Sequence, residues 1–194
     1  RLRTVTGVQT CALPISIACL LLEFYVPGTM RWFTPCVFGP ASIGLVALGW
    51  RDRSVCIGAA AGLAATVAYD VFRVPFVVWA GMPLFKVFPQ FGAMILGGPA
   101  SAPAAHVAGW IYHFSNGITF GVMYAALVGM AFRRRWPVAV VFAMGLEAAM
   151  LLTPYTSRFG IGLTAKFVAV TLTAHLVFGV TMGLTGKWLA RETD

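Results

Sequence analysis

The sequence predicts an all-α fold, a polytopic bundle of transmembrane helices. Hydrophobic residues make up 59% of the 194 residues and charged residues only 10%, and the mean hydropathy is +0.84. A soluble domain is roughly 45–50% apolar and about 25% charged. The apolar residues also gather in runs close to the ~20 residues that a helix needs to cross a bilayer. These observations exclude a soluble globular domain and a disordered tail. We expect about five transmembrane helices plus a short re-entrant or interfacial helix.

The first 15 residues are predicted to lie outside the folded domain. Val5–Ile15 reads VTGVQTCALPI, which looks like a translated sequencing adapter, and Arg1–Thr4 adjoins it. Segments of this kind are left out of fold reasoning. We therefore expect residues 1–15 to be an artefact that is disordered. Ser16–Asp194 is expected to form a single helical transmembrane domain that is truncated at its N-terminus.

Five apolar runs are the candidates for the crossing helices, and the first of them is short for a span. In chain order they are Pro35–Trp50, Ser54–Ala80, Ala104–Phe132, Pro137–Pro154 and Gly162–Leu189. A further run, Pro83–Gly98, contains Lys86 and Pro89 and is too short to cross. We expect it to form the re-entrant or interfacial helix, packed against protein or lying at the membrane surface.

Small residues on these predicted helices indicate where the helices approach each other. Gly58 and Gly62 form a GxxxG pattern on one helix, and Gly117 and Gly121 form another on the next crossing helix. This spacing lets two backbones come close together. We therefore expect helix contacts at these positions. Three glycines line the last helix in the same way: Gly179, Gly183 and Gly186.

Basic residues set the predicted orientation in the membrane. An excess of Lys and Arg marks the cytoplasmic side, so Arg133–Arg135 is placed inside. Arg51, Arg53 and the C-terminal tail with Lys187 and Arg191 then also fall inside. We expect a multi-pass protein of the cell membrane, of the bacterial inner-membrane type, with a cytoplasmic C-terminus. The tryptophans agree, since three fall at this inner interface, where their amphipathic rings are favoured: Trp50, Trp136 and Trp188.

The net charge of +8 does not indicate nucleic-acid binding. The basic residues stand singly or in threes between apolar runs, which is typical of loop charges that fix topology and not of a phosphate-binding face. The expected partner is the lipid bilayer, without nucleic acid. Membrane partner subunits remain open as a further possibility.

Ionisable residues inside the predicted helices form the candidate site. At a rise of 1.5 Å per residue, one residue from each of four helices falls roughly 10–20 Å below the outer surface. Charged groups are costly in hydrocarbon and by default face the bundle interior, where they mark functional paths. The predicted buried polar layer contains Asp70, Arg73, His113, Asn116, Glu147 and His175, with Tyr112 and Tyr155 as further candidates to reach it.

Each member of this layer also has a purely structural interpretation. Asp70 and Arg73 are spaced i,i+3 on one helix and can pair with each other. Glu147 can be a neutral carboxylic acid that is hydrogen-bonded to a neighbouring helix. A single His in a membrane helix commonly forms a hydrogen bond to another helix. The sequence leaves open whether the layer is a functional site or structural glue.

Three functions follow from these observations. The favoured one is ion, proton or small-solute handling through the polar layer, with no predicted cofactor and no assigned catalytic residue, and the sequence leaves open whether the protein is an enzyme. The alternative is a membrane redox protein in which His113 and His175 ligate haem b, or in which Glu147 and Asp70 join them around a divalent metal. The third is an accessory subunit without chemistry of its own. Motifs of zinc hydrolases, dinucleotide-binding proteins and P-loop proteins are absent from the sequence.

Overall fold

The computed structural model describes residues 22–38, 40, 44, 47 and 52–191, and within these residues it is helical and without strands. The all-α prediction is therefore confirmed. The elements are α3 (Thr29–Phe33), η1 (Thr34–Phe38, a π-helical turn), α5 (Arg53–Val78), α6 (Val87–Leu96), α7 (Pro103–Val128), α8 (Phe132–Leu152), α9 (Tyr155–Arg158) and α10 (Ala165–Leu189). The predicted disordered segment Arg1–Ile15 and most of the predicted helix Pro35–Trp50 lie outside the described residues.

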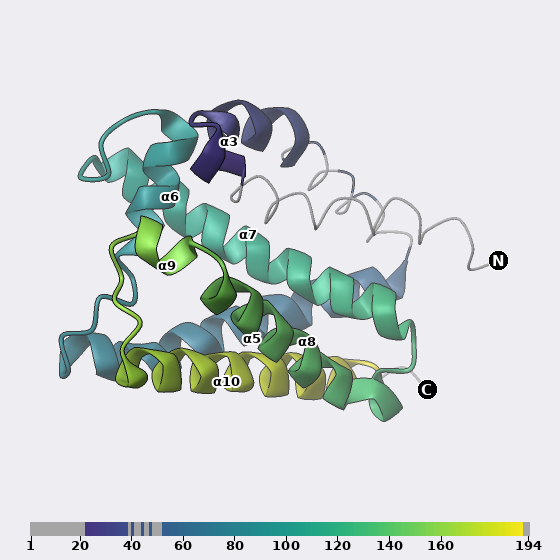
Figure 1. Ribbon diagram of the computed structural model, residues 1–194. Coiled ribbons are helices and arrows are strands. Elements are labelled where there is room, and N and C mark those ends of the chain that lie inside the picture. Colours follow the sequence, from purple (N-terminus) through teal and green to yellow (C-terminus); the bar gives the residue numbers. More distant parts are fainter. Residues whose placement is uncertain (1–21, 39, 41–43, 45–46, 48–51, 192–194) are drawn as a thin grey trace.

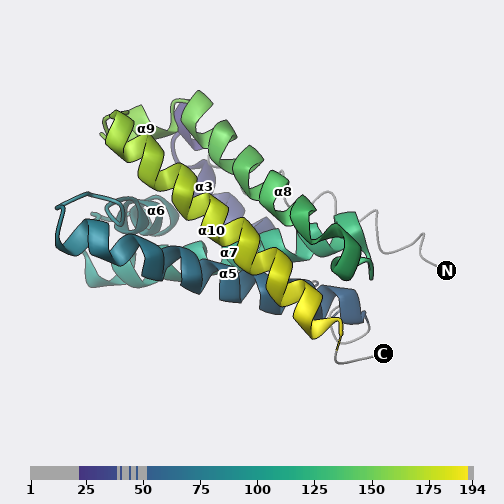
Figure 2. The ribbon, with the colours of Figure 1, turned by 90° about the horizontal axis from the view of Figure 1, so that it is seen from below.

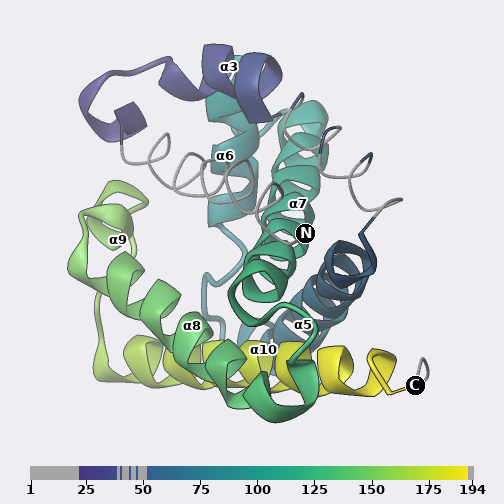
Figure 3. The ribbon, with the colours of Figure 1, turned by 90° about the vertical axis from the view of Figure 1, so that its right-hand side faces the viewer.

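Helices α5, α7, α8 and α10 form the body of the bundle (Figure 1). Figure 2 shows α10 between α5 and α8, and it packs against both of them. Helix α7 packs along α5, and the short α6 packs on α7. In Figure 3, α8 and α9 lie on one side of the bundle and α6 and α7 on the other. Helices α10 and α5 therefore connect the α8–α9 side of the bundle to the α6–α7 side.

The outer surface of the bundle suits a membrane. Helices α5, α8 and α10 are each long and apolar enough to cross one. Helix α7 is equally long but less apolar, because it contains two histidines, a serine and an asparagine. Large apolar side chains cover the outward faces of the helices, where lipid would contact them: Val67, Val71, Val74, Val107, Ile111, Val141, Leu176 and Leu184. The chain is therefore a polytopic helical bundle of the membrane class.

Two helix boundaries differ from their predicted positions. Helix α8 begins at Phe132, so Arg133–Arg135 forms its first turn and is not a loop. The backbone at Arg135 is non-helical, with φ −109° and ψ 15°. Pro137 explains this kink, because proline removes one helical hydrogen bond and its ring displaces the carbonyl of the preceding turn. Helix α7 ends earlier than predicted, at Val128, because Gly129 leaves the helix at φ 55°.

The predicted glycine contact between α5 and α7 is confirmed. A side-chain Cβ at Gly58 would come 2.5 Å from the backbone oxygen of Gly121, and one at Gly62 would overlap the backbone oxygen of Gly117. The two helices run antiparallel and touch through backbone atoms. This close approach brings the middle of α5, with its ionisable residues, directly against the middle of α7.

Glycines also set two further contacts. Gly179 and Gly183 of α10 face the backbone of α8, as the sequence predicts. The contact between α6 and α7 was not predicted: a Cβ at Gly92 would overlap the backbone of Ala105, and one at Gly109 would overlap that of Phe88. Helix α6 is therefore held tightly against α7. The predicted short helix is present and packs on protein.

Candidate functional site

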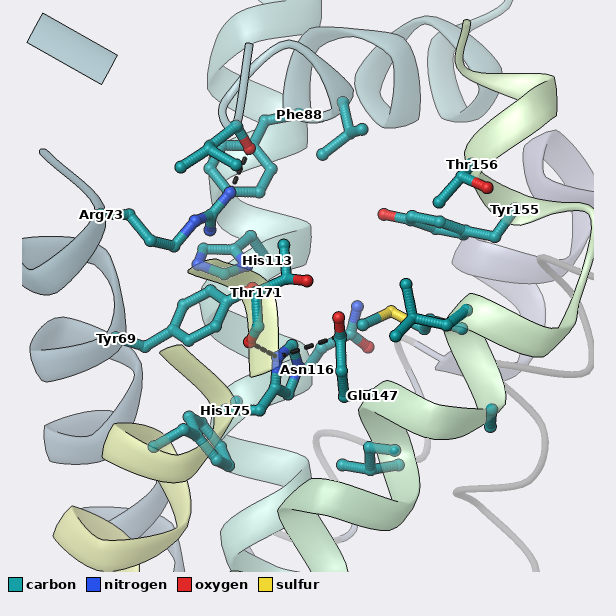
Figure 4. Close-up of a pocket in the computed structure, with 18 of the residues that line it drawn as sticks. Tyr69, Arg73, Phe88, His113, Asn116, Glu147, Tyr155, Thr156, Thr171 and His175 are labelled. Carbon is teal, nitrogen blue, oxygen red and sulfur yellow. Dashed lines mark hydrogen bonds and ion pairs between the residues drawn. The ribbon is translucent and has the colours of Figure 1, made fainter. Parts of the chain in front are cut away.

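A cavity of about 210 Å³ lies in the interior of the bundle (Figure 4). Side chains of α5, α6, α7, α8, α9 and α10 line it, and most of them are aliphatic or aromatic. A largely apolar cavity with a few convergent polar groups is the usual form of a small-molecule site. The polar lining residues are Thr66, Tyr69, Arg73, Tyr112, His113, Asn116, Glu147, Thr153, Tyr155, Thr156, Thr171 and His175.

On one side of the cavity, Asp70 of α5 connects two other polar residues. One carboxylate oxygen lies 2.9 Å from Nε2 of His113 on α7, and the other lies 3.3 Å from Nη1 of Arg73. His113 stacks on Phe88 with ring centroids 4.3 Å apart. Asp70 does not itself line the cavity, whereas His113 and Arg73 do. Asp70 therefore fixes, from behind, two groups that face the cavity.

The guanidinium of Arg73 is enclosed by protein. Its Nη2 donates a hydrogen bond to the backbone oxygen of Leu84, and its central carbon lies 4.5 Å from the ring centre of Tyr69 and 4.8 Å from that of Phe85. Aromatic faces attract a guanidinium and suit its planar shape. Arg73 is 4% exposed. Its charge therefore stays in place and balances that of Asp70.

On the other side, Glu147 of α8 meets His175 of α10. Oε2 of Glu147 lies 3.0 Å from Nδ1 of His175, and the backbone oxygen of Thr171 lies 3.0 Å from the same nitrogen. Since a carbonyl oxygen only accepts, Nδ1 carries a proton and donates it to the backbone oxygen of Thr171, while Oε2 of Glu147 lies beside the same N–H at ion-pair distance. In a neutral ring, Nε2 is then an acceptor. Among the described residues, no hydrogen-bond partner contacts that nitrogen.

Glu147 differs from Asp70 in its charge balance. It is 2% exposed, and within the described part of the chain no Lys or Arg forms an ion pair with it. Its Oε1 has no hydrogen-bond partner among the described residues either. The cavity therefore contains one acidic group that is buried, faces the cavity and lacks a cationic partner.

Two tyrosines lie across the cavity from each other. The ring of Tyr69 lies 5.0 Å from that of His175 and 6.2 Å from that of His113, measured between centroids, so it joins the two carboxylate–histidine pairs in one layer. Figure 4 shows the hydroxyl of Tyr155, from α9, pointing into the cavity from the opposite wall. Burial raises the pKa of Tyr155, so this hydroxyl remains protonated and able to donate.

The structure brings the sequence-predicted residues together at this cavity. Five of them line it and Asp70 lies directly behind: the five are Arg73, His113, Asn116, Glu147 and His175. The carbonyl oxygen of Asn116 is buried without a hydrogen-bond partner. Sequence reasoning missed Thr66 and Tyr69. Their spacing gives the missing signal, because residues 66, 69 and 73 share one face of an otherwise apolar helix.

The geometry differs from the proposed haem and metal alternatives in two respects. Among the described residues, no group of three His, Cys, Asp or Glu side chains is placed to hold a metal ion. Nε2 of His113 is also bonded to Asp70. The polar layer consists of two separate carboxylate–histidine pairs beside a cavity.

The fold and the cavity together define a class, a polytopic helical bundle with a buried polar site between its membrane-spanning helices. The chain belongs to a family of unknown function, DUF6789, whose model matches residues 52–194. This range includes α5 to α10 and every residue that lines the cavity. No curated protein and no solved structure was found to match the chain.

Proposed function

We propose that this protein handles protons or a small solute within the membrane, with the cavity as the binding site and Glu147–His175 as the group that changes protonation. One observation carries the proposal: Glu147 is buried beside the cavity without a cationic partner. An isolated carboxylate in a low-dielectric interior costs several kcal/mol. The Glu147 carboxyl therefore holds a proton or is balanced by a cation in the cavity.

The Glu147–His175 pair has the geometry to accept and release one proton. With the cavity empty, the proton resides on Oε1 of Glu147, while Nδ1 of His175, 3.0 Å from Oε2, donates its hydrogen bond to the backbone oxygen of Thr171. His175 offers a second position, because its Nε2 has no partner among the described residues. A proton that reaches Nε2 from the cavity gives an imidazolium, which lies beside the carboxylate of Glu147. Intramembrane pairs of this kind are the usual elements of proton relays.

The second pair differs because its charge is already balanced. Asp70 contacts both Arg73 and His113, so it has a cationic partner without help from the cavity. It holds the imidazole of His113 at the wall and orients the guanidinium of Arg73. We assign it a positioning role, and we place the exchangeable charge at Glu147.

We propose the cell membrane as the location, of the bacterial inner-membrane type, with the C-terminus in the cytoplasm. Gly186 lies near Phe132 and Tyr124. These contacts support the placement of the C-terminal ends of α7 and α10 and the N-terminal end of α8 at the same end of the bundle. Basic residues gather at this end in Arg133–Arg135 and Lys187. By the positive-inside rule this end faces the cytoplasm. A C-terminal reporter that works only outside the cytoplasm would contradict this orientation.

Access of water to the cavity tests the proposed function. The test uses single cysteines in a background without the four native ones. Asn116→Cys and Thr171→Cys place a thiol at the cavity, whereas Ile111→Cys and Leu176→Cys place one on the outward faces of the same two helices. Because only an ionised thiol reacts, a membrane-impermeant maleimide needs water at the labelled position.

We expect the reagent to label both cavity positions from one side of the membrane and to leave the two outward controls unlabelled. This result requires that solute and protons can reach the cavity. Absence of labelling at both cavity positions, from either side, would contradict a role in permeation. The polar layer would then have only a structural role, which is to hold the helices together.

A further inference from the structure

The unbalanced groups of the cavity define the class of solute that it would bind, and this inference rests on the binding role proposed above. We infer that the solute is a small protonated amine with an apolar body, which binds with its ammonium group at Glu147 and releases one proton in exchange. Three properties of the cavity carry the inference: its charge, its hydrogen-bonding atoms and its apolar walls.

The charge of the cavity favours a cation. Arg73 and Asp70 balance each other at 3.3 Å, so neither attracts an external ion strongly. Glu147 remains as the one carboxyl at the wall that lacks a cationic partner among the described residues. A cation at that position supplies the missing counter-charge, whereas an anion would be repelled by an ionised Glu147.

The hydrogen-bonding atoms favour a cation that carries N–H groups. Oε1 of Glu147 and Nε2 of His175 are acceptors with no partner among the described residues. The carbonyl oxygen of Asn116 is a third acceptor and is buried without a partner. A primary ammonium has three N–H donors. A quaternary ammonium carries the same charge but has no donor, so it would leave these acceptors unsatisfied.

The walls favour an apolar body of limited size. The cavity holds about 210 Å³, and most of its surface comes from side chains such as Phe88, Phe91, Phe120, Met150 and Phe178. Burial of an aromatic or aliphatic group against these walls is favourable in proportion to its area. The rings of tyrosines at the wall add attraction for the cation.

Charge balance gives the exchange step. Before binding, the carboxyl of Glu147 holds a proton and the cavity is balanced. The ammonium enters with one positive charge, and the proton leaves the carboxyl for water, so the net charge does not change. The other titratable or charged groups that line the cavity with Glu147 are His175 of α10, Tyr69 and Arg73 of α5, Tyr112 and His113 of α7 and Tyr155 of α9. Of these, His175 is in direct contact, but its contacting atom Nδ1 already carries a proton, so the proton of Glu147 leaves for water in the cavity.

Calorimetry of the purified protein in detergent tests the inference with four matched probes. They are 2-phenylethylammonium, its N,N,N-trimethyl analogue, the neutral 3-phenylpropan-1-ol and the anion 3-phenylpropanoate. We expect the ammonium to bind at least about tenfold more tightly than each of the other three, because only it supplies both charge and donors. Titrations in buffers of different ionisation enthalpy should report the release of about one proton per bound ammonium.

Two variants check the site. Glu147→Gln should weaken ammonium binding at least about tenfold and remove the proton release, because the amide keeps the shape but not the charge. Asn116→Leu should weaken binding severalfold through the loss of one acceptor. Glu23→Gln is the matched control: Glu23 caps the backbone of Gly28 and Met30 outside the cavity, and this variant should bind like the wild type.

Equal binding of the trimethyl or neutral probe, tighter binding of the anion, or unchanged binding to Glu147→Gln would each overturn the inference. If Glu147→Gln does not fold, the inference is tested by the binding of the four probes to the wild type and to Asn116→Leu. The cysteine labelling separates the two proposals. A labelled cavity that binds no ammonium would overturn the amine and leave the proposed function standing, whereas an unlabelled cavity would contradict the proposed function itself.

Discussion

At the scale of single residues, the two carboxylates of the polar layer behave differently although both contact a histidine. Asp70 pairs with Arg73 at 3.3 Å, and the guanidinium is fully enclosed by aromatic rings and a backbone oxygen. Within the described residues, the one polar side chain that pairs with Glu147 is His175. Removal of the carboxylate therefore affects stability differently at the two positions. Loss of Asp70 leaves the buried cation of Arg73 without a partner, whereas loss of Glu147 leaves no buried cation.

Substitution of Asp70 should be severely destabilising. In Asp70→Leu the guanidinium of Arg73 loses its counter-charge inside the protein, and breaking a buried pair in this way costs about 3–5 kcal/mol. The double variant Asp70→Leu/Arg73→Met should recover most of this loss, because no unpaired charge remains. Reversible unfolding in detergent measures both values. Equal destabilisation in the single and double variants would show that the ion pair is not the cause.

Substitution of Glu147 should affect stability little. The Nδ1 proton of His175 keeps the backbone oxygen of Thr171 as its acceptor when the carboxylate is removed. We therefore expect Glu147→Gln and Glu147→Leu to change the free energy of unfolding by no more than about 1 kcal/mol. A decrease of more than about 3 kcal/mol in the free energy of unfolding of Glu147→Leu would show that the residue holds the helices together.

At the scale of helices, glycine contacts decide how closely α5 and α7 approach. A methyl group at Gly62 would meet the backbone of Gly117 and Gly121, which cannot move aside as a side chain can. Gly62→Ala should therefore destabilise the protein by about 1–3 kcal/mol. Gly145→Ala on α8 is the matched control, because nothing lies within 4 Å of its Cβ position. This control should be neutral or stabilised by about 0.5–1 kcal/mol.

Thermal unfolding of the two glycine variants under identical detergent conditions measures the difference. The same substitution at two helical glycines separates the intrinsic helix preference of alanine, which is common to both, from the steric overlap, which occurs only at Gly62. Equal stability of the two variants would show that the α5–α7 contact tolerates a wider separation.

Much of the site could be predicted because the rise of a helix is fixed. Depth below the surface follows from sequence position alone, so Asp70, His113, Glu147 and His175 could be assigned to one layer. The rotation of each helix about its axis is set by packing, so the partner of each residue could not be assigned. His113 pairs with Asp70, and His175 with Glu147, because the glycine-containing faces of α5 and α7, and of α10 and α8, pack against each other.

At the scale of the whole molecule, the cavity lies where α7 and α8 form opposite walls and α10 and α5 bridge them (Figure 3). The outer surface of the bundle is apolar, and its charged residues gather at the helix ends or at the cavity. This distribution fits a protein whose polar chemistry is enclosed within a membrane. The match of the family model to residues 52–194 covers this whole arrangement.

The central claim is that Glu147 exchanges a proton inside this cavity, and infrared difference spectroscopy of the purified protein tests it most directly. A protonated carboxyl has a C=O stretching band that an ionised one lacks. We predict such a band in the wild type with the cavity empty, its absence from Glu147→Gln and its retention in Glu23→Gln. Identical spectra for the wild type and Glu147→Gln over the whole pH range would contradict the claim.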